Sequence, residues 1–213
     1  PFTADSNRQF SRELRLQMQR RAFGMKEDPE WTDLINKIDQ SHKEIHGHMR
    51  GIDEARAVNG ARDIEHTPGH FRYAWEPSRF VEFTRTVEGR RALIQAFKTG
   101  YMKSHEFSDK IAERVAIAIV DRFSNMGMGI NAADSRLLDL DSRVSIEQVL
   151  GDAGMSPRDI EAVIDRLTVK TQERTKKGYL KRRLEVDLST PIPGSDKKLV
   201  DLMDDDFERS MQQ

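Results

Sequence analysis

The stretch SIEQVLGDAGMSPRDIEAVIDRL at residues 145–167 has the pattern of two short helices joined by a tight turn. Ser145 begins a capping-box sequence and is the expected N-cap of the first helix. Gly154 lies in the turn, where glycine adopts the left-handed conformation that ends many helices. Ser156 is the expected N-cap of the second helix, with Pro157 at its first position. This order predicts a helix-turn-helix, a motif that many helical hairpins share without binding DNA.

Two charged blocks follow this helix pair, first basic and then acidic. Residues 170–183, named here the basic run, carry seven Lys and Arg residues against one acid, Glu173. Such a block neutralises several phosphates of a nucleic acid, although a solvated helix face explains it equally well. The candidate DNA-binding residues of the basic run are Lys170, Arg174, Lys176, Lys177, Lys181, Arg182 and Arg183. The acidic block consists of Asp196, Asp201, Asp204, Asp205, Asp206 and Glu208.

The stretch VDLSTPIPGSDKKLVDL at residues 186–202 resembles the linker of bacterial and phage sigma factors. That linker has a Leu-Asp-x-Pro-Ile/Val stretch, a Gly/Asp-rich turn and a Leu-x-Asp-Leu/Phe pair. Residues 145–167 resemble the helix-turn-helix-like domain that precedes it, which contacts promoter DNA, whereas the linker enters the polymerase cleft. The resemblance implies that Arg158 and the basic run face DNA, and that Asp187–Asp206 form a finger inserted into RNA polymerase. The residues implied to bind polymerase are Asp187, Leu188, Asp196, Asp201, Asp204 and Asp205.

The N-terminal part of the chain is predicted to contain two helices. A basic segment at residues 8–26 carries apolar side chains at helical spacing, which indicates an amphipathic helix. Pro29 suits the start of a second helix, and apolar residues keep the helical period from Trp31 to Met49. Glycine and proline then interrupt the pattern, so residues 51–76 are expected to be a linker with at most one short helix.

The central part is also predicted to be helical, which makes the whole chain an all-α, multi-helical protein. One helical block runs from Pro77 to Tyr101, the most apolar helix occupies residues 107–124, and residues 125–142 form an exposed connection. Residues 184–188 alternate and indicate either a short strand or an extended segment. The expected organisation is two N-terminal helices (1–50), a linker (51–76), a central helical domain (77–142), a helix-turn-helix-like domain with the basic run (143–183) and an extended acidic finger or tail (184–213).

Composition excludes several classes of protein. The chain has no cysteine, so disulfides, thiolate zinc sites and a cysteine nucleophile are excluded. Charged residues make up 33% and hydrophobic residues 37%, which favours a modest core with much solvated helix surface. No apolar run approaches the ~20 residues that span a bilayer, and no signal peptide is recognisable at the polar N-terminus. A cytoplasmic protein without membrane contact is therefore expected.

The histidines and the other polar residues do not form a catalytic or metal-binding motif. Five of the six histidines lie between residues 42 and 70, and His42 and His46 have the i, i+4 spacing that two ligands on one helix require. His66 and His70 share this spacing, but a Pro-Gly pair separates them. Structural histidines are favoured over a metal site. Phosphate-binding glycine loops and nucleophile elbows are absent from the sequence, so we expect no enzyme activity, metal or cofactor.

Three functions fit these features. The first is a sigma-like or accessory transcription factor that binds RNA polymerase core and promoter DNA, favoured by the order of helix pair, basic run and acidic segment. The alternative is a phage virion or assembly protein with protein partners, because the charged helical sequence holds no catalytic constellation. A simple DNA-binding regulator is the third, and its affinity would depend steeply on salt.

Overall fold

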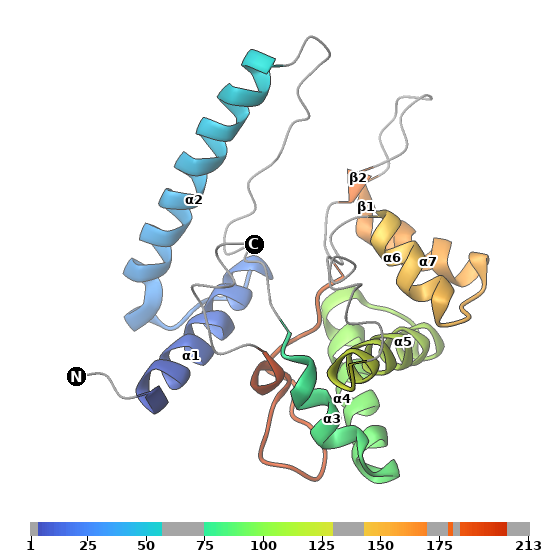
Figure 1. The fold of residues 1–213 in the computed structure, drawn as a ribbon. Helices are drawn as coiled ribbons and strands as arrows, with labels where there is room; N and C mark the ends of the chain where they lie inside the picture. Colours follow the sequence, from blue (N-terminus) through green and yellow to red (C-terminus); the bar gives the residue numbers. More distant parts are fainter. Residues whose placement is uncertain (1–3, 57–74, 130–142, 170–178, 181–183, 204–213) are drawn as a thin grey trace. The chain divides into compact units, whose positions relative to one another are not determined.

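The computed structural model describes residues 4–56, 75–129, 143–169, 179–180 and 184–203. The chain divides into two compact units, which are described separately. The first unit comprises residues 1–73 and 205–213, and the second comprises residues 74–204. The predicted all-α, multi-helical class is confirmed, because α-helices dominate the described residues of both units (Figure 1).

Two helices make up the described part of the first unit. α1 spans Ala4–Ala22 and α2 spans Pro29–Arg56. Both helices are predicted by the sequence, but α2 continues through Gly51, where the sequence predicts a linker. A glycine inside a helix costs only about 1 kcal/mol relative to alanine, which neighbouring residues readily offset. The remainder of the predicted linker up to residue 74 lies outside the described residues.

Apolar packing and one arginine hold α1 against α2. Leu14 of α1 is buried against Ile35 of α2, together with partly buried side chains from the first turns of α2. Arg21 at the end of α1 donates a hydrogen bond to Asp39 Oδ2 at 2.9 Å and also pairs with Glu27 in the connecting loop. One guanidinium therefore ties the loop and the second helix to the end of the first.

The pairing of Glu27 predicts that acid weakens the first unit. The hydrogen bond from Arg21 lowers the pKa of Glu27 from its usual value. A carboxyl with a lowered folded-state pKa stabilises the fold above its ordinary pKa, and this contribution is lost as pH falls through the folded-state pKa. We expect the thermal stability measured by Trp31 fluorescence to fall as the pH drops below about 5. Glu27→Gln should flatten this dependence, whereas Asp33→Asn on the exposed side of α2 should leave it unchanged; identical profiles for both would contradict the prediction.

Three helices form the body of the second unit. α3 spans Pro77–Thr84, α4 spans Val87–His105 and α5 spans Asp109–Gly127. The sequence predicts one block across the first two, but the structure breaks it after α3. Thr86 explains the break, because its side chain accepts a hydrogen bond from the Gly89 N–H at 3.0 Å and so caps a new helix.

Aromatic side chains fill the space between these helices. Phe80, Phe97 and Phe123 come from α3, α4 and α5, and each is essentially inaccessible to solvent. The Phe80 ring lies 4.8 Å from that of Phe123 and 5.8 Å from that of Phe97, measured between ring centroids. Trp75 adds a fourth ring at 5.5–5.8 Å from all three. One aromatic cluster therefore joins the start of the unit to its three central helices.

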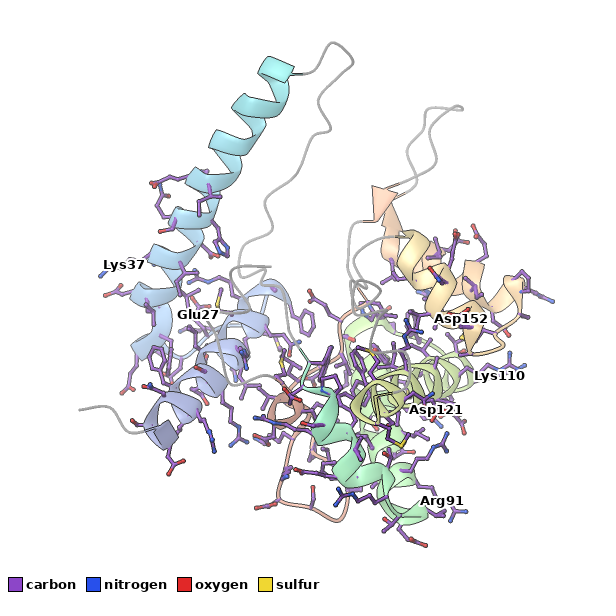
Figure 2. The ribbon with its side chains drawn as sticks, in the orientation of Figure 1. Glu27, Lys37, Arg91, Lys110, Asp121 and Asp152 are labelled. Atoms are coloured by element: carbon purple, nitrogen blue, oxygen red, sulfur yellow. The ribbon has the colours of Figure 1, made fainter. Side chains whose placement is uncertain are left out.

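Two further contacts fix the position of α5. Arg90 of α4 donates hydrogen bonds to both carboxylate oxygens of Asp121, at 2.7 and 2.9 Å; Asp121 is labelled on α5 in Figure 2. At the end of α5, a Cβ on Gly127 would lie 2.3 Å from the carbonyl oxygen of Pro77. The missing side chain of Gly127 thus allows the end of α5 to approach the backbone at the start of α3.

Residues 184–203, named here the strap, pack first on the end of α4 and then on α3. Leu184, Val186 and Leu188 are buried, so the alternation at residues 184–188 is that of an extended segment packed on a helix. The backbone of Glu185 forms two hydrogen bonds with the end of α4. Ser104 Oγ donates to the Glu185 carbonyl at 2.7 Å, and the Glu185 N–H donates to His105 Nε2 at 3.1 Å. This region is therefore a core element of the second unit, and it lies in the part of the chain that the sequence predicts as an extended acidic finger or tail.

The strap packs closely on α4 at Gly100. A Cβ there would lie 2.3 Å from Val186 Cγ2, a short and stiff side chain. Overpacking of this kind costs about 1–3 kcal/mol, and alanine recovers up to about 1 kcal/mol of helix propensity. Gly100→Ala is therefore expected to lower the free energy of unfolding by about 1–2 kcal/mol in urea titrations. Gly151→Ala is the matched control, because its Cβ would meet only Ile160 Cδ1 at 4.0 Å; equal effects of the two changes would refute the prediction.

The second unit is closed where its two ends meet. Trp75 and Met203 form an antiparallel β-bridge, and the Glu76 N–H donates to the Leu202 carbonyl at 2.9 Å. Arg79 Nη1 donates to two carbonyl oxygens near the end of the strap, those of Asp201 at 2.9 Å and Met203 at 2.6 Å. The chain therefore enters and leaves this unit side by side.

Among the described residues, every helix is too short or too polar to cross a membrane.

Candidate nucleic-acid interface

The predicted helix pair is present. α6 spans Arg143–Asp152 and α7 spans Pro157–Leu167, joined by a turn in which Gly154 has φ +76°. Ser156 Oγ accepts the Asp159 N–H at 3.2 Å and caps α7, as predicted. The predicted cap of the first helix is wrong, because α6 already begins at Arg143 and Ser145 lies inside its first turn. The capping-box pattern at Ser145 is only a local signal, and here the helix begins two residues before it.

The helix pair is packed as a hairpin and attached to α5. Its buried apolar residues are Ile146, Val149, Leu150, Met155, Val163, Ile164 and Leu167. Arg114 of α5 forms an ion pair with Asp159 in the first turn of α7. Eight residues later on α5, Arg122 lies 4.0 Å from Asp152 at the end of α6, as Nη1 to Oδ2 (Figure 2). One face of α5 thus carries both helices of the pair.

The exposed face of α7 carries charges of both signs. Arg158 and Arg166 are exposed, and so are Glu161 and Asp165. These side chains cancel to a net charge of zero. In a helix-turn-helix the second helix enters the major groove, where Arg recognises guanine and carboxylates accept from cytosine. The exposed face of α7 carries side chains of the kinds that contact bases. Because it has no net charge, attraction to phosphates has to come from residues outside α7.

Two short strands that the sequence does not predict follow α7, the first of them directly. β1 spans Thr168–Val169 and β2 spans Tyr179–Leu180, paired antiparallel as Thr168 with Leu180 and Val169 with Tyr179. The strands bring together the two ends of residues 170–178, which hold Lys170, Arg174, Lys176 and Lys177. These four and Lys181, Arg182 and Arg183 lie outside the described residues. A two-residue strand leaves no alternation long enough to detect in a sequence.

The residues implied to bind polymerase are only partly available on the surface of the strap. Leu188 is 1% exposed and belongs to the core. Asp187 Oδ1 accepts hydrogen bonds from the Ser189 N–H and hydroxyl at 3.0 and 2.6 Å. Asp201 Oδ2 accepts the Lys198 N–H at 2.7 Å and caps a 3-10 helix at Leu199–Leu202. Asp196 is exposed, whereas the other two implied residues, Asp204 and Asp205, lie outside the described residues.

The histidines give no metal centre within the described part of the chain. His42 is half-buried on α2, the side chain of His46 is outside the description, and His66 and His70 are in the undescribed segment. No group of three or more metal-ligating side chains occurs among the residues that the structure describes. His105 binds the strap backbone, which is a structural contact.

Comparisons with models of protein families, with curated proteins and with solved structures found nothing that matches this chain.

Proposed function

We propose that this protein is a sigma-like or accessory transcription factor that binds DNA through α7 and the basic run and also contacts RNA polymerase. The observation that carries the proposal is the order of α7, β1 and the basic run. α7 ends at Leu167 and β1 begins at the next residue, so the basic run starts at the end of the helix that would enter the groove. A helix that would contact bases is thus followed directly by a segment that would neutralise phosphates. DNA-binding proteins use base contacts for specificity and phosphate contacts for positioning.

The attachment to α5 supports the same proposal. Recognition elements are precise when they stand on rigid supports, and the ion pairs of Arg114 and Arg122 fix the end of α6 and the start of α7, on either side of the turn between them. On the polymerase side, Asp196 offers an exposed acidic group to a basic surface. The buried Leu188 has no part in that contact unless the strap leaves α4.

The test is binding to labelled duplex DNA and to RNA polymerase core. The full chain should bind duplex DNA at low-micromolar concentration in about 50 mM salt, with an affinity that falls steeply as salt rises. It should also be retained by immobilised polymerase core. Absence of both interactions at low salt would refute the proposal, and DNA binding alone would reduce it to a DNA-binding regulator.

One observation favours the alternative of a virion or assembly protein. The exposed face of α7 is electrically neutral, with Arg158 and Arg166 balanced by Glu161 and Asp165, as expected of a protein-binding face. Sedimentation would then show a ring or another large oligomer, and neither DNA nor polymerase would bind.

A further inference from the structure

The last residue of α4, His105, is a buried histidine that binds the start of the strap. It is 6% exposed, and its ring stacks near those of Tyr101 and Phe107, with centroids 6.3 and 5.2 Å away. At the edge of the ring, Nε2 accepts a hydrogen bond from the Glu185 N–H at 3.1 Å. The imidazole is therefore packed against aromatic side chains and bound to the strap backbone.

The hydrogen bond to Glu185 requires the neutral form of the histidine. A neutral imidazole has one N–H donor and one nitrogen acceptor, whereas the imidazolium ion has two donors and no acceptor. Because Nε2 accepts the Glu185 N–H, the proton of the neutral ring is on Nδ1. A second proton would be placed on Nε2, where it would face the N–H of Glu185. Protonation of His105 therefore removes this contact and sets two donors against each other.

The ionisable groups near this contact cannot replace the lost acceptor. On α4, Tyr101 stays uncharged because burial raises its pKa, and Glu106, the next residue after the helix, is exposed. On the strap, Glu185 carries a partly buried carboxylate, and Asp187 Oδ2 lies 3.5 Å from Lys103 Nζ of α4. These charges influence the pH at which the histidine takes up a proton. They do not change the consequence, because the imidazolium has no acceptor at any pH.

The contact with His105 holds one end of the strap only. Ser104 Oγ also binds the start of the strap, but a hydroxyl group keeps its protonation state across the ordinary pH range. The other end of the strap is bound by Arg79, whose guanidinium stays charged. Protonation of His105 therefore weakens the start of the strap selectively. Residues 181–183 of the basic run precede this point directly, so the strap attaches the end of the basic run to α4.

We propose that His105 is a pH-sensitive switch that holds the start of the strap on α4 when its ring is neutral and releases it when its ring is protonated. Histidine is the side chain that ordinarily changes its charge between about pH 5 and pH 8. Because the contact requires the neutral ring, it stabilises the fold above the ordinary histidine pKa of about 6.5 and is lost as the pH falls below that value. The inference is independent of DNA or polymerase binding.

Amide hydrogen exchange of the full chain, measured by NMR at about pH 8 and pH 5, tests the release. The Glu185 amide should lose protection about tenfold or more at the lower pH, after correction for the intrinsic exchange rate. The Leu199 amide is the internal control, because it donates to the Thr190 carbonyl at 3.0 Å. Its protection should change by less than about twofold. Unchanged protection at Glu185 would overturn the proposal, and so would equal losses at both amides, which indicate general unfolding by acid.

His105→Gln is the matched variant, because the glutamine amide oxygen accepts a hydrogen bond at any pH. In this variant, the Glu185 amide should keep its protection at about pH 5 to within about twofold. A loss over the same pH range as in the unmodified chain would assign the switch to another group and overturn the proposal.

The titration of the His105 ring itself gives a second test, which does not depend on the folding of the variant. The ¹⁵N shifts of the ring nitrogens in the unmodified chain report its protonation. Their midpoint should coincide, within about 0.5 pH unit, with the loss of protection at Glu185. A ring that titrates at a clearly different pH, or that stays neutral down to about pH 5, would contradict the proposal.

Discussion

Phe80→Ala is expected to lower the free energy of unfolding of the second unit by about 3–5 kcal/mol. Phe80 is 0% exposed and lies within 5.8 Å of the rings of Trp75, Phe97 and Phe123, measured between centroids. Removing its ring leaves a cavity where three helices meet and also withdraws support from Trp75. A loss of this size is a large share of the 5–15 kcal/mol that stabilises a typical protein, so the unit should be partly unfolded near 37 °C.

The measurement can be made on the full chain because each unit contains one tryptophan. Trp31 belongs to α2 and Trp75 to the aromatic cluster. In a Trp31→Phe background, Trp75 fluorescence follows the second unit alone during urea titration. Val87→Ala is the control, since Val87 is 60% exposed and should change stability by less than about 0.5 kcal/mol. A loss below about 1.5 kcal/mol for Phe80→Ala would mean that Phe80 is not the centre of the core.

Neutralising the basic run should produce the largest change in DNA affinity. Lys170, Arg174, Lys176 and Lys177 lie between β1 and β2, and their replacement by glutamine removes four positive charges. Each phosphate contact contributes about 0.9 to the slope of log K against log salt, so the slope should become shallower by about 3–4 units. We expect an affinity loss of about 100-fold at low salt, measured by fluorescence anisotropy with a labelled duplex.

Four exposed basic residues elsewhere provide the matched control, namely Lys26, Lys37, Arg85 and Arg91. Their replacement by glutamine changes the net charge by the same amount but leaves the basic run intact. The control should lose less than about fivefold in affinity, with its salt slope nearly unchanged. Equal losses in both variants would indicate that basic side chains anywhere on the surface attract DNA equally, with no defined interface.

Local sequence signals predict the helices well and their limits less well. Ser156 followed by Pro157 predicts the start of α7, because the side-chain oxygen and the fixed proline conformation act within a few residues. Thr86 gives an equally local signal, but the apolar period that runs through residues 80–101 conceals it. Gly51 fails as a boundary, since its cost inside a helix is small compared with the rest of α2.

Contacts between distant residues could not be predicted in the same way. The strap packs on α4 because Gly100 leaves room for Val186. These two residues are 86 positions apart in the sequence, and no sequence pattern indicates that they are in contact. The acidic residues of the strap favour an extended finger or tail in the prediction. The strap is nevertheless buried through the apolar residues that alternate with them, Leu184, Val186 and Leu188. The candidate interface is predicted as a helix pair with a basic run, but the strands that close residues 170–178 are too short to recognise.

The meeting of the two ends of the second unit has a mechanical consequence. Tension applied between the segments before Trp75 and after Met203 passes directly through the bridge between them. The force is borne by the hydrogen bond from Glu76 to Leu202 and by those from Arg79. The parts of the helices beyond these bonds form a side branch that carries no load. Under a pulling force the hydrogen bonds of the bridge would break first, and the helices of the core would unfold only after they had broken.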